Sequence, residues 1–135
     1  MTLEQVKIFA TENGVKIFDV PLCDVDALST PSGHIAIDSG RAQTGAREKA
    51  LLAHELGHCV TGSFYSAHTK VNVVAKNEYR ADKWAAHTLM PFAEIKAAVS
   101  SGIRNDWEMA EHFGVPREFV KRAFEIYRRE GLCLA

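Results

Sequence analysis

The segment Leu52–Cys59, LAHELGHC, restricts the fold of this chain more than any other, because two histidines stand four residues apart in it. An α-helix turns by about 100° per residue, so on a helix His58 lies about 40° from His54, and Glu55 lies about 100° from His54. The opposite side then carries side chains suited to a core: Leu52, Leu56, Cys59 and Val60. The segment therefore predicts an amphipathic helix with both imidazoles on one flank.

Signals on both sides of the segment set the bounds of this helix. Thr44 can cap its start, and Gly62 can end it in a left-handed conformation after Thr61. Gly57 lies within the histidine flank, where it costs roughly 1 kcal/mol of helix propensity relative to alanine. We expect another backbone or a substrate to approach closely there.

The residues before this helix predict a small sheet. Thr2 and Gln5 match a capping box at the start of a helix that Gly14 can end. Val71–Val74 is a candidate strand, and two earlier stretches, separated by a polar segment, have the composition of strands: Val15–Val20 and His34–Asp38. We therefore expect a short sheet of two or three strands.

The rest of the chain is expected to be helical. Asn77 can cap a helix that continues through Leu89 and is broken by Met90-Pro91. Three shorter helices are then expected: Pro91–Ser101, Asn105–Phe113 and Pro116–Arg129. Strands followed by helices indicate an α+β domain. A length of 135 residues suits one domain, 1–135, in which residues 91–135 form a C-terminal helical region packed on the core.

Composition narrows the classes of function. An apolar content of 47% and a charged content of 24% are ordinary for a soluble globular protein. A net charge of -1 gives little support to nucleic-acid binding, and no apolar run reaches the roughly 20 residues that span a bilayer. The N-terminal segment lacks the apolar stretch of a signal peptide. Three widely spaced cysteines, Cys23, Cys59 and Cys133, fit reduced and buried thiols, so we expect a cytoplasmic protein without nucleic-acid or membrane partners.

The H-E-x-x-H pattern is typical of a metal site. Imidazoles at positions i and i+4 can bind one zinc ion, and the adjacent glutamate can reach a water bound to that ion. A catalytic zinc has three protein ligands and an open position, so a third ligand is needed. The alternative is a surface helix whose histidines and glutamate face water.

The next helix offers the third ligand. Glu78, Asp82 and Ala85 fall on one face at positions i, i+4 and i+7, and two buried carboxylates are costly without a cation. Zinc would neutralise Glu78, and Asp82 could accept a hydrogen bond from the ring N–H of His54 or His58. The alternative places Glu78 in the first helical turn, stabilised by the helix dipole, with Asp82 paired at the surface.

These motifs carry a resemblance to a known family. The sequence H-E-L-G-H, followed by E-x-x-A-D-x-x-A-A-x-x-L-M-P, resembles the ImmA/IrrE family of small bacterial and phage-associated zinc peptidases over roughly Arg47 to Pro91. The resemblance implies a zincin-like fold of the gluzincin type. It also implies one zinc per chain held by His54, His58 and Glu78, with Glu55 as general base and Asp82 orienting a histidine ligand.

The same resemblance implies a substrate. Members of the family cleave a helix-turn-helix repressor encoded in a mobile element or stress locus, and so act as anti-repressors. We therefore expect an endopeptidase of narrow specificity. The candidates for a second donor to the reacting carbonyl oxygen are Tyr65 and His68, in the loop after the histidine helix, and His112, if the C-terminal helices fold over the site. The strand His34–Asp38 could offer a free edge to an extended substrate.

Two other functions compete with the peptidase. The segment from Trp107 to Arg122 reads like a helix-turn-helix with a basic second helix, which would suit a DNA-binding regulator with a structural zinc. Against that reading, the first helix is acidic, and Phe119, Ala123 and Tyr127 look like core residues. The other candidate is a toxin or partner-binding module of a gene pair, which would keep the same fold and the same zinc chemistry.

Overall fold

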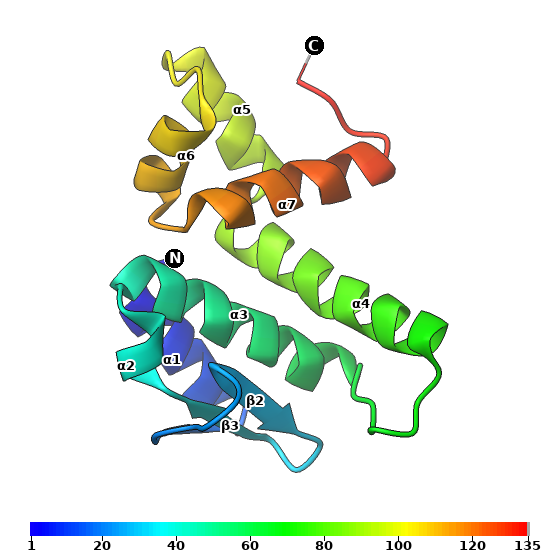
Figure 1. The fold of residues 1–135 in the computed structure, drawn as a ribbon. Helices are drawn as coiled ribbons and strands as arrows, with labels where there is room; N and C mark the ends of the chain where they lie inside the picture. The colour runs from blue at the N-terminus through cyan, green and yellow to red at the C-terminus, as the bar shows by residue number, and fades with distance from the viewer. Residues whose placement is uncertain (135) are drawn as a thin grey trace.

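The computed structural model describes residues 1–134 and has the α+β organisation that the sequence predicts. Its elements are α1 (Leu3–Glu12), β1 (Lys16–Asp19), β2 (Ala27–Thr30), β3 (His34–Ile37), α2 (Ser39–Ala42), α3 (Gly45–Thr61), α4 (Val71–Leu89), α5 (Phe92–Ser100), α6 (Asp106–Phe113) and α7 (Arg117–Arg129). The sheet and α1 lie on one side of α3, α4 runs along α3, and α5, α6 and α7 gather at the C-terminal end of α4 (Figure 1). No helix within residues 1–134 is long and apolar enough to cross a membrane.

The sheet has its third strand in a place that the sequence did not indicate. The strand order is β1-β3-β2, with β1 parallel and β2 antiparallel to β3. Strand β2 lies in the polar stretch before β3, and the two are joined by a short turn in which Gly33 has a φ of +85°. The candidate strand Val71–Val74 is wrong, because it forms the first turn of α4. The four strand-forming residues are followed by a longer helical pattern, and the longer pattern determines the structure.

The position of β3 overturns the expected role of the His34–Asp38 stretch as a free edge. Strand β3 is the central strand, so both of its sides are used in pairing, and the edges of the sheet are β1 and β2. Ile35 and Ile37 are buried beneath the helices, whereas Phe18 and Leu28 lie on the outer face with Ala36 between them. Any added strand would have to pair with β1 or β2.

The caps of α1 and α3 agree with the sequence signals. Thr2 and Gln5 form the reciprocal bonds of a capping box, and the Thr44 side chain accepts a hydrogen bond from the Arg47 N–H. Gly62 ends α3 with a φ of +67°. The expected cap at Asn77 is wrong, because α4 already begins at Val71. The Asn77 amide instead donates to the carbonyl of Phe64 and fixes the preceding loop.

The core-facing side of α3 differs in part from the predicted one. Leu52 and Leu56 are fully buried, but Ala53 and Gly57 complete that side, and Val60 is exposed. The cysteines also differ from expectation, since Cys23 and Cys133 are exposed and Cys59 is only half-buried. The sequence therefore predicted where α3 begins and ends better than it predicted which of its side chains are buried.

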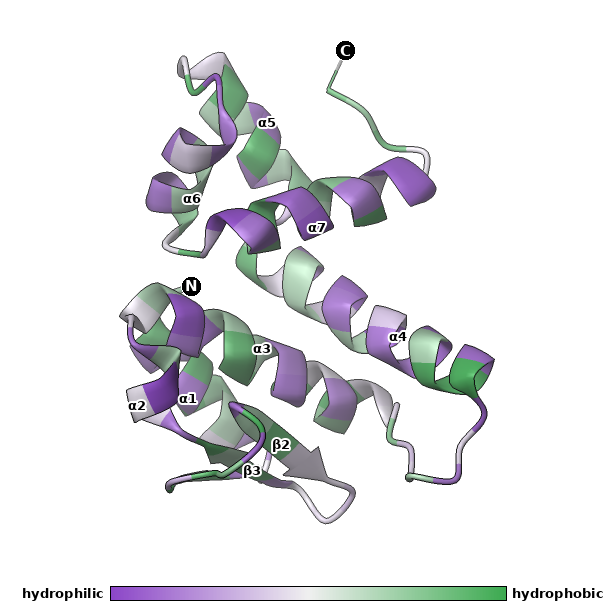
Figure 2. Ribbon diagram, in the orientation of Figure 1, coloured by the Kyte–Doolittle hydropathy of each residue, from purple (hydrophilic) through white to green (hydrophobic). Residues whose placement is uncertain are grey.

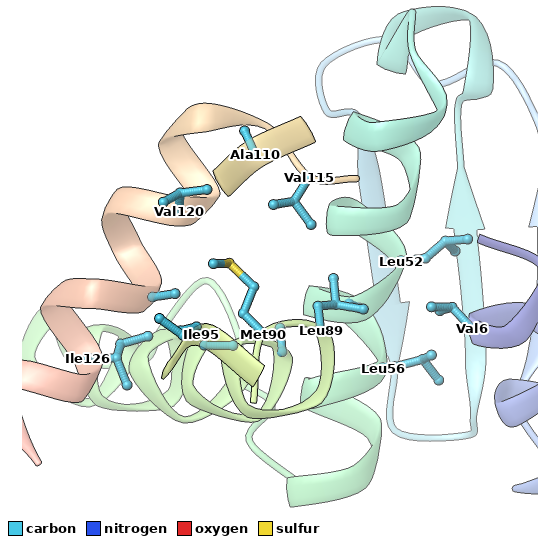
Figure 3. Packing of buried hydrophobic residues seen from close by; sticks show 14 of the residues in the cluster. Val6, Leu52, Leu56, Leu89, Met90, Ile95, Ala110, Val115, Val120 and Ile126 are labelled. Atoms are coloured by element: carbon cyan, nitrogen blue, oxygen red, sulfur yellow. The ribbon is translucent and has the colours of Figure 1, made fainter. Parts of the chain in front are cut away.

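A single hydrophobic cluster links the sheet side of α3 to the C-terminal helices. Figure 3 shows side chains of α5, α6 and α7 gathered around Met90, and Leu52 and Leu56 of α3 facing Val6 of α1. Hydrophobic and hydrophilic residues alternate along α4 and α7 (Figure 2), as amphipathic helices at a core require. The Tyr127 hydroxyl is buried and donates to the carbonyl of Met90 at 2.7 Å, so α7 is bonded to the end of α4.

Lys49 joins three distant segments at the N-terminal end of α3. Its side chain is only 5% exposed, and its ammonium donates to the carbonyl oxygens of Met1 at 2.9 Å and Phe113 at 2.6 Å. Burial lowers the pKa of Lys49, because a desolvated ammonium is costly. The two carbonyl acceptors offset part of that cost and hold α6 against α3.

Helices α3 and α4 come into close backbone contact at Gly57. A Cβ atom at this position would stand 2.5 Å from the backbone oxygen of Ala81, closer than non-bonded atoms approach. Ala81 and Ala85 on the facing side of α4 are completely buried. The close backbone approach that Gly57 predicted is therefore present, and small residues on both helices allow it.

We expect Gly57→Ala to lower the free energy of unfolding by about 1–3 kcal/mol, because the added methyl would force α3 and α4 apart. The matched control is Gly45→Ala in the same helix, where a methyl meets no atom within 4 Å. That change should alter stability by less than about 0.5 kcal/mol. Urea unfolding of both variants in the presence of a chelator tests this, and equal losses would contradict the steric explanation.

Candidate metal centre

Three side chains from α3 and α4 converge on one point. His54, His58 and Glu78 each offer a ligand atom, and these atoms all lie within 4.8 Å of one another. Glu78 Oε2 lies 2.9 Å from His54 Nε2, and Glu78 Oε1 lies 3.3 Å from His58 Nε2. Two imidazole nitrogens and one carboxylate oxygen suit a divalent transition metal and leave room for a further ligand. The group could therefore hold a metal ion.

The far nitrogen of each imidazole has its own acceptor. His54 Nδ1 lies 2.7 Å from Asp82 Oδ1, and His58 Nδ1 lies 2.6 Å from the backbone oxygen of Ser63. Both acceptors require a hydrogen on Nδ1, so in the neutral rings the lone pairs are on the Nε2 atoms that face Glu78. This tautomer is the one that a metal at the convergence point needs.

Local backbone geometry places the Ser63 oxygen. Gly62 turns the chain back at the end of α3, so that residue 63 folds against the side of the helix. Ser63 is buried, and its hydroxyl also lies 3.2 Å from His58 Nδ1. A backbone carbonyl has no side-chain signature, so the sequence could not identify this contact.

Asp82 connects the site to the C-terminal helices. Its Oδ1 accepts from His54, and its Oδ2 accepts from Arg122 Nε of α7 at 3.0 Å. Burial acts to raise the pKa of Asp82, but the hydrogen bonds and positive charges of His54 and Arg122 outweigh it and hold that pKa below the ordinary value. The sequence indicated Asp82 as the partner of a histidine, but Arg122 was missed because it lies 40 residues further along the chain.

The local charge favours a cation at the convergence point. Burial acts to lower the pKa of His54, but the hydrogen bond to Asp82 and the negative charges of Asp82, Glu55 and Glu78 raise it above the ordinary value. Positive charge on or beside the ring is thus stabilised by three carboxylates. A divalent ion bound there would be stabilised by the same three carboxylates.

Glu55 faces a hollow beside the histidines. The hollow measures about 280 Å³. It is lined by residues of β2 and the segment before it, of α3 and α4, and of the loop after α3: Val25, Ala27, Leu28, Ser29, Glu55, His58, Phe64, Tyr65 and Glu78. Its lining includes apolar side chains, those of Val25, Leu28 and Phe64, as well as the carboxylates of Glu55 and Glu78 and the imidazole of His58. Glu55 is half-buried, and its Oε1 accepts a hydrogen bond from the Ser29 hydroxyl at 2.6 Å. An edge strand therefore borders the hollow directly.

The three candidate donors to a carbonyl oxygen lie in different places. The Tyr65 hydroxyl lies in the hollow and donates to Glu78 Oε1, and this hydrogen bond, with partial desolvation, raises the pKa of Tyr65 to about 12. His68 is exposed in the loop and is not among the residues that line this hollow. His112 lines a larger hollow of about 720 Å³ near Lys49 and Met1, away from the converging ligands. Of the three, the structure brings Tyr65 to the site.

Comparison with known proteins gives one match. A family model described as Peptidase_M78, IrrE N-terminal-like domain, matches residues 10–125, which span the sheet, both helices of the site and most of α7. No curated protein and no solved structure matches the chain. The matched range includes every residue of the His54, His58 and Glu78 group.

We expect Arg122→Met to lower the free energy of unfolding by about 1–2 kcal/mol, because it leaves Oδ2 of the half-buried Asp82 without its charged donor. Methionine keeps an apolar stem beside Tyr79, whose ring lies 5.6 Å from the Arg122 guanidinium. Arg129→Met is the control, since Arg129 packs on the same ring at 4.1 Å but has no ion pair within residues 1–134. Urea unfolding without metal tests the difference, and equal losses would contradict a specific contribution of the Asp82 contact.

Proposed function

The chain belongs to the IrrE N-terminal-like family of metal-dependent peptidases, and on that premise we propose that it is a zinc endopeptidase. The observation that carries the proposal is the convergence of His54, His58 and Glu78 with both Nδ1 atoms already bonded to acceptors. We propose these three residues as the ligands of one zinc ion per chain. Asp82 would fix the tautomer of His54, and Glu55 would act as general base.

The proposed chemistry follows from where the chain places its groups. Zinc, when bound, would lower the pKa of a coordinated water toward about 7 and polarise the substrate carbonyl. Glu55 stands beside the first ligand, and its carboxylate faces the hollow, so it can take a proton and pass it to the departing amine. Tyr65 keeps its proton at neutral pH and can donate to the carbonyl oxygen once it leaves Glu78.

The substrate would lie along β2. This strand is at the edge of the sheet and borders the hollow through Leu28 and Ser29. An extended peptide can pair with an edge strand through main-chain hydrogen bonds. The apolar lining residues Val25, Leu28 and Phe64 would then contact the side chains next to the scissile bond. This placement replaces the His34–Asp38 edge that the sequence suggested.

We propose a helix-turn-helix repressor as the substrate, which would make the protein an anti-repressor of a mobile element or stress locus. The support is the family relationship. The competing DNA-binding function is disfavoured because two basic residues of α7 already have partners within the protein. Arg117 pairs with Asp106, and Arg122 pairs with Asp82, so both are committed within the protein. Incubation with a repressor encoded next to this gene, followed by sequencing of the fragments, tests the substrate.

Metal analysis of the purified protein tests the proposed ligands. We expect about one zinc per chain in the wild type, and a sharp loss in Glu78→Ala, because two imidazoles alone bind zinc more weakly than three ligands. Glu94→Ala removes an exposed carboxylate from α5 and should leave the zinc content unchanged. Equal zinc contents in all three proteins would contradict the assignment of Glu78.

Glu55→Gln separates catalysis from metal binding. We expect hydrolysis to fall by roughly 100-fold or more with the zinc content unchanged, because an amide cannot take the proton. The substrate for the assay is a mixed library of internally quenched peptides, with cleavage sites read by mass spectrometry. Glu48→Gln is the control, since Glu48 belongs to the same helix but pairs with Lys7 outside the hollow. Wild-type hydrolysis in Glu55→Gln would refute the role of Glu55.

A further inference from the structure

Ser29 of β2 contacts Glu55, the general base of the proposed chemistry. Its hydroxyl lies 2.6 Å from Glu55 Oε1. An ionised carboxylate only accepts hydrogen bonds, so the hydroxyl is the donor. Within residues 1–134 this is the one hydrogen bond of the Glu55 carboxylate, and no cationic side chain pairs with it.

The register of the sheet explains why a serine of β2 can reach α3. Ser29 is paired with Ile35, and directly paired residues lie on the same face of a sheet. Ile35 is completely buried beneath the helices, so Ser29 also points inward, toward α3. The neighbours Leu28 and Thr30 point to the other face, so no other residue of β2 from Leu28 to Thr30 is placed to make this contact.

The geometry points to Ser29 as the positioning residue of the general base, an inference that rests on the proposed peptidase function. A glutamate side chain has several rotatable bonds, and a half-buried one can move away from the hollow unless it is held. The Ser29 hydroxyl holds Oε1 and leaves Oε2 available to accept the proton that must be transferred. Because the donor is neutral, it orients the carboxylate without placing an opposing charge beside it, as an arginine or lysine would.

The same contact links substrate docking to the base. Strand β2 is the edge along which the extended peptide would lie, and Ser29 belongs to that strand. Any movement of the strand on docking would be transmitted to Glu55 through a single hydrogen bond. Substrate alignment and the orientation of the base would therefore both depend on β2.

The experiment compares three variants of the full chain loaded with zinc. Ser29→Ala removes the hydroxyl, Ser29→Thr retains it, and Thr30→Val removes a hydroxyl from the other face of the same strand. With a peptide that the wild type cleaves, we expect Ser29→Ala to lower kcat by roughly 3- to 10-fold, with KM changed by less than about twofold. Ser29→Thr should restore kcat, and Thr30→Val should behave as the wild type. Zinc content should be the same in all four proteins.

Each other result would count against the inference. A wild-type kcat in Ser29→Ala, or an effect on KM or zinc content alone, would overturn it. A crystal structure of zinc-loaded Ser29→Ala gives a readout that does not need activity: several conformers of Glu55 support the positioning role, and one wild-type conformer overturns it. If the wild type holds zinc but cleaves no peptide and no repressor, the peptidase proposal fails, and the structural readout still decides the role of Ser29.

Discussion

The close contact between α3 and α4 is the constraint on which the rest of the site depends. The histidines project from α3 and Glu78 from α4, so the distance between the helix axes decides whether their ligand atoms can meet. Gly57 and Ala81 set that distance, because no side chain at residue 57 separates the two backbones. A glycine in the middle of a helix weakens it, and the burial of Ala81, Ala85 and Leu89 along the contact offsets that loss. Helix packing and the convergence of the three side chains thus depend on the same residue.

The polar groups of the site form a connected set rather than separate pairs. Arg122 bonds Asp82, Asp82 bonds His54, and His54 faces Glu78, which in turn accepts from Tyr65. Members of the set come from α3, α4, α7 and the loop after α3. Within residues 1–134 no buried side-chain nitrogen or oxygen lacks a partner. Such a set favours one orientation of the two imidazoles, which a metal ion held by His54, His58 and Glu78 would require.

The sequence predicted those features that depend on residues close together along the chain. Caps and glycines gave the bounds of α3, and the spacing of four residues placed His54 and His58 on one flank. Glu78 and Asp82 could be found because helical spacing puts both on the face that meets α3. Their roles as ligand and orienting carboxylate stay predictions until metal binding is measured.

Features that depend on tertiary structure could not be predicted in this way. The partner of Glu55 is Ser29, which belongs to a strand within the polar segment between the two predicted strands. The partner of Asp82 is Arg122, which lies on a helix 40 residues further along the chain. The partner of His58 is a backbone oxygen, which any residue at position 63 would supply. The start of α4 at Val71 is a further example. The strand preference of these first residues was outweighed by the longer helical pattern that follows them.

The contacts of Lys49 have a consequence for how the molecule opens. One ammonium donates to the carbonyl oxygens of Met1 and Phe113, so the N-terminal residue, the first turns of α3 and the end of α6 meet at the buried Lys49. If these segments separate, the buried Lys49 ammonium loses the carbonyl oxygens that accept its hydrogen bonds. Hydrogen exchange should therefore report them as one cooperative unit, with amides at both ends of the sequence gaining and losing protection together. The helix that carries the histidines begins at this point, so the loss of the Lys49 contacts would release the first turns of that helix.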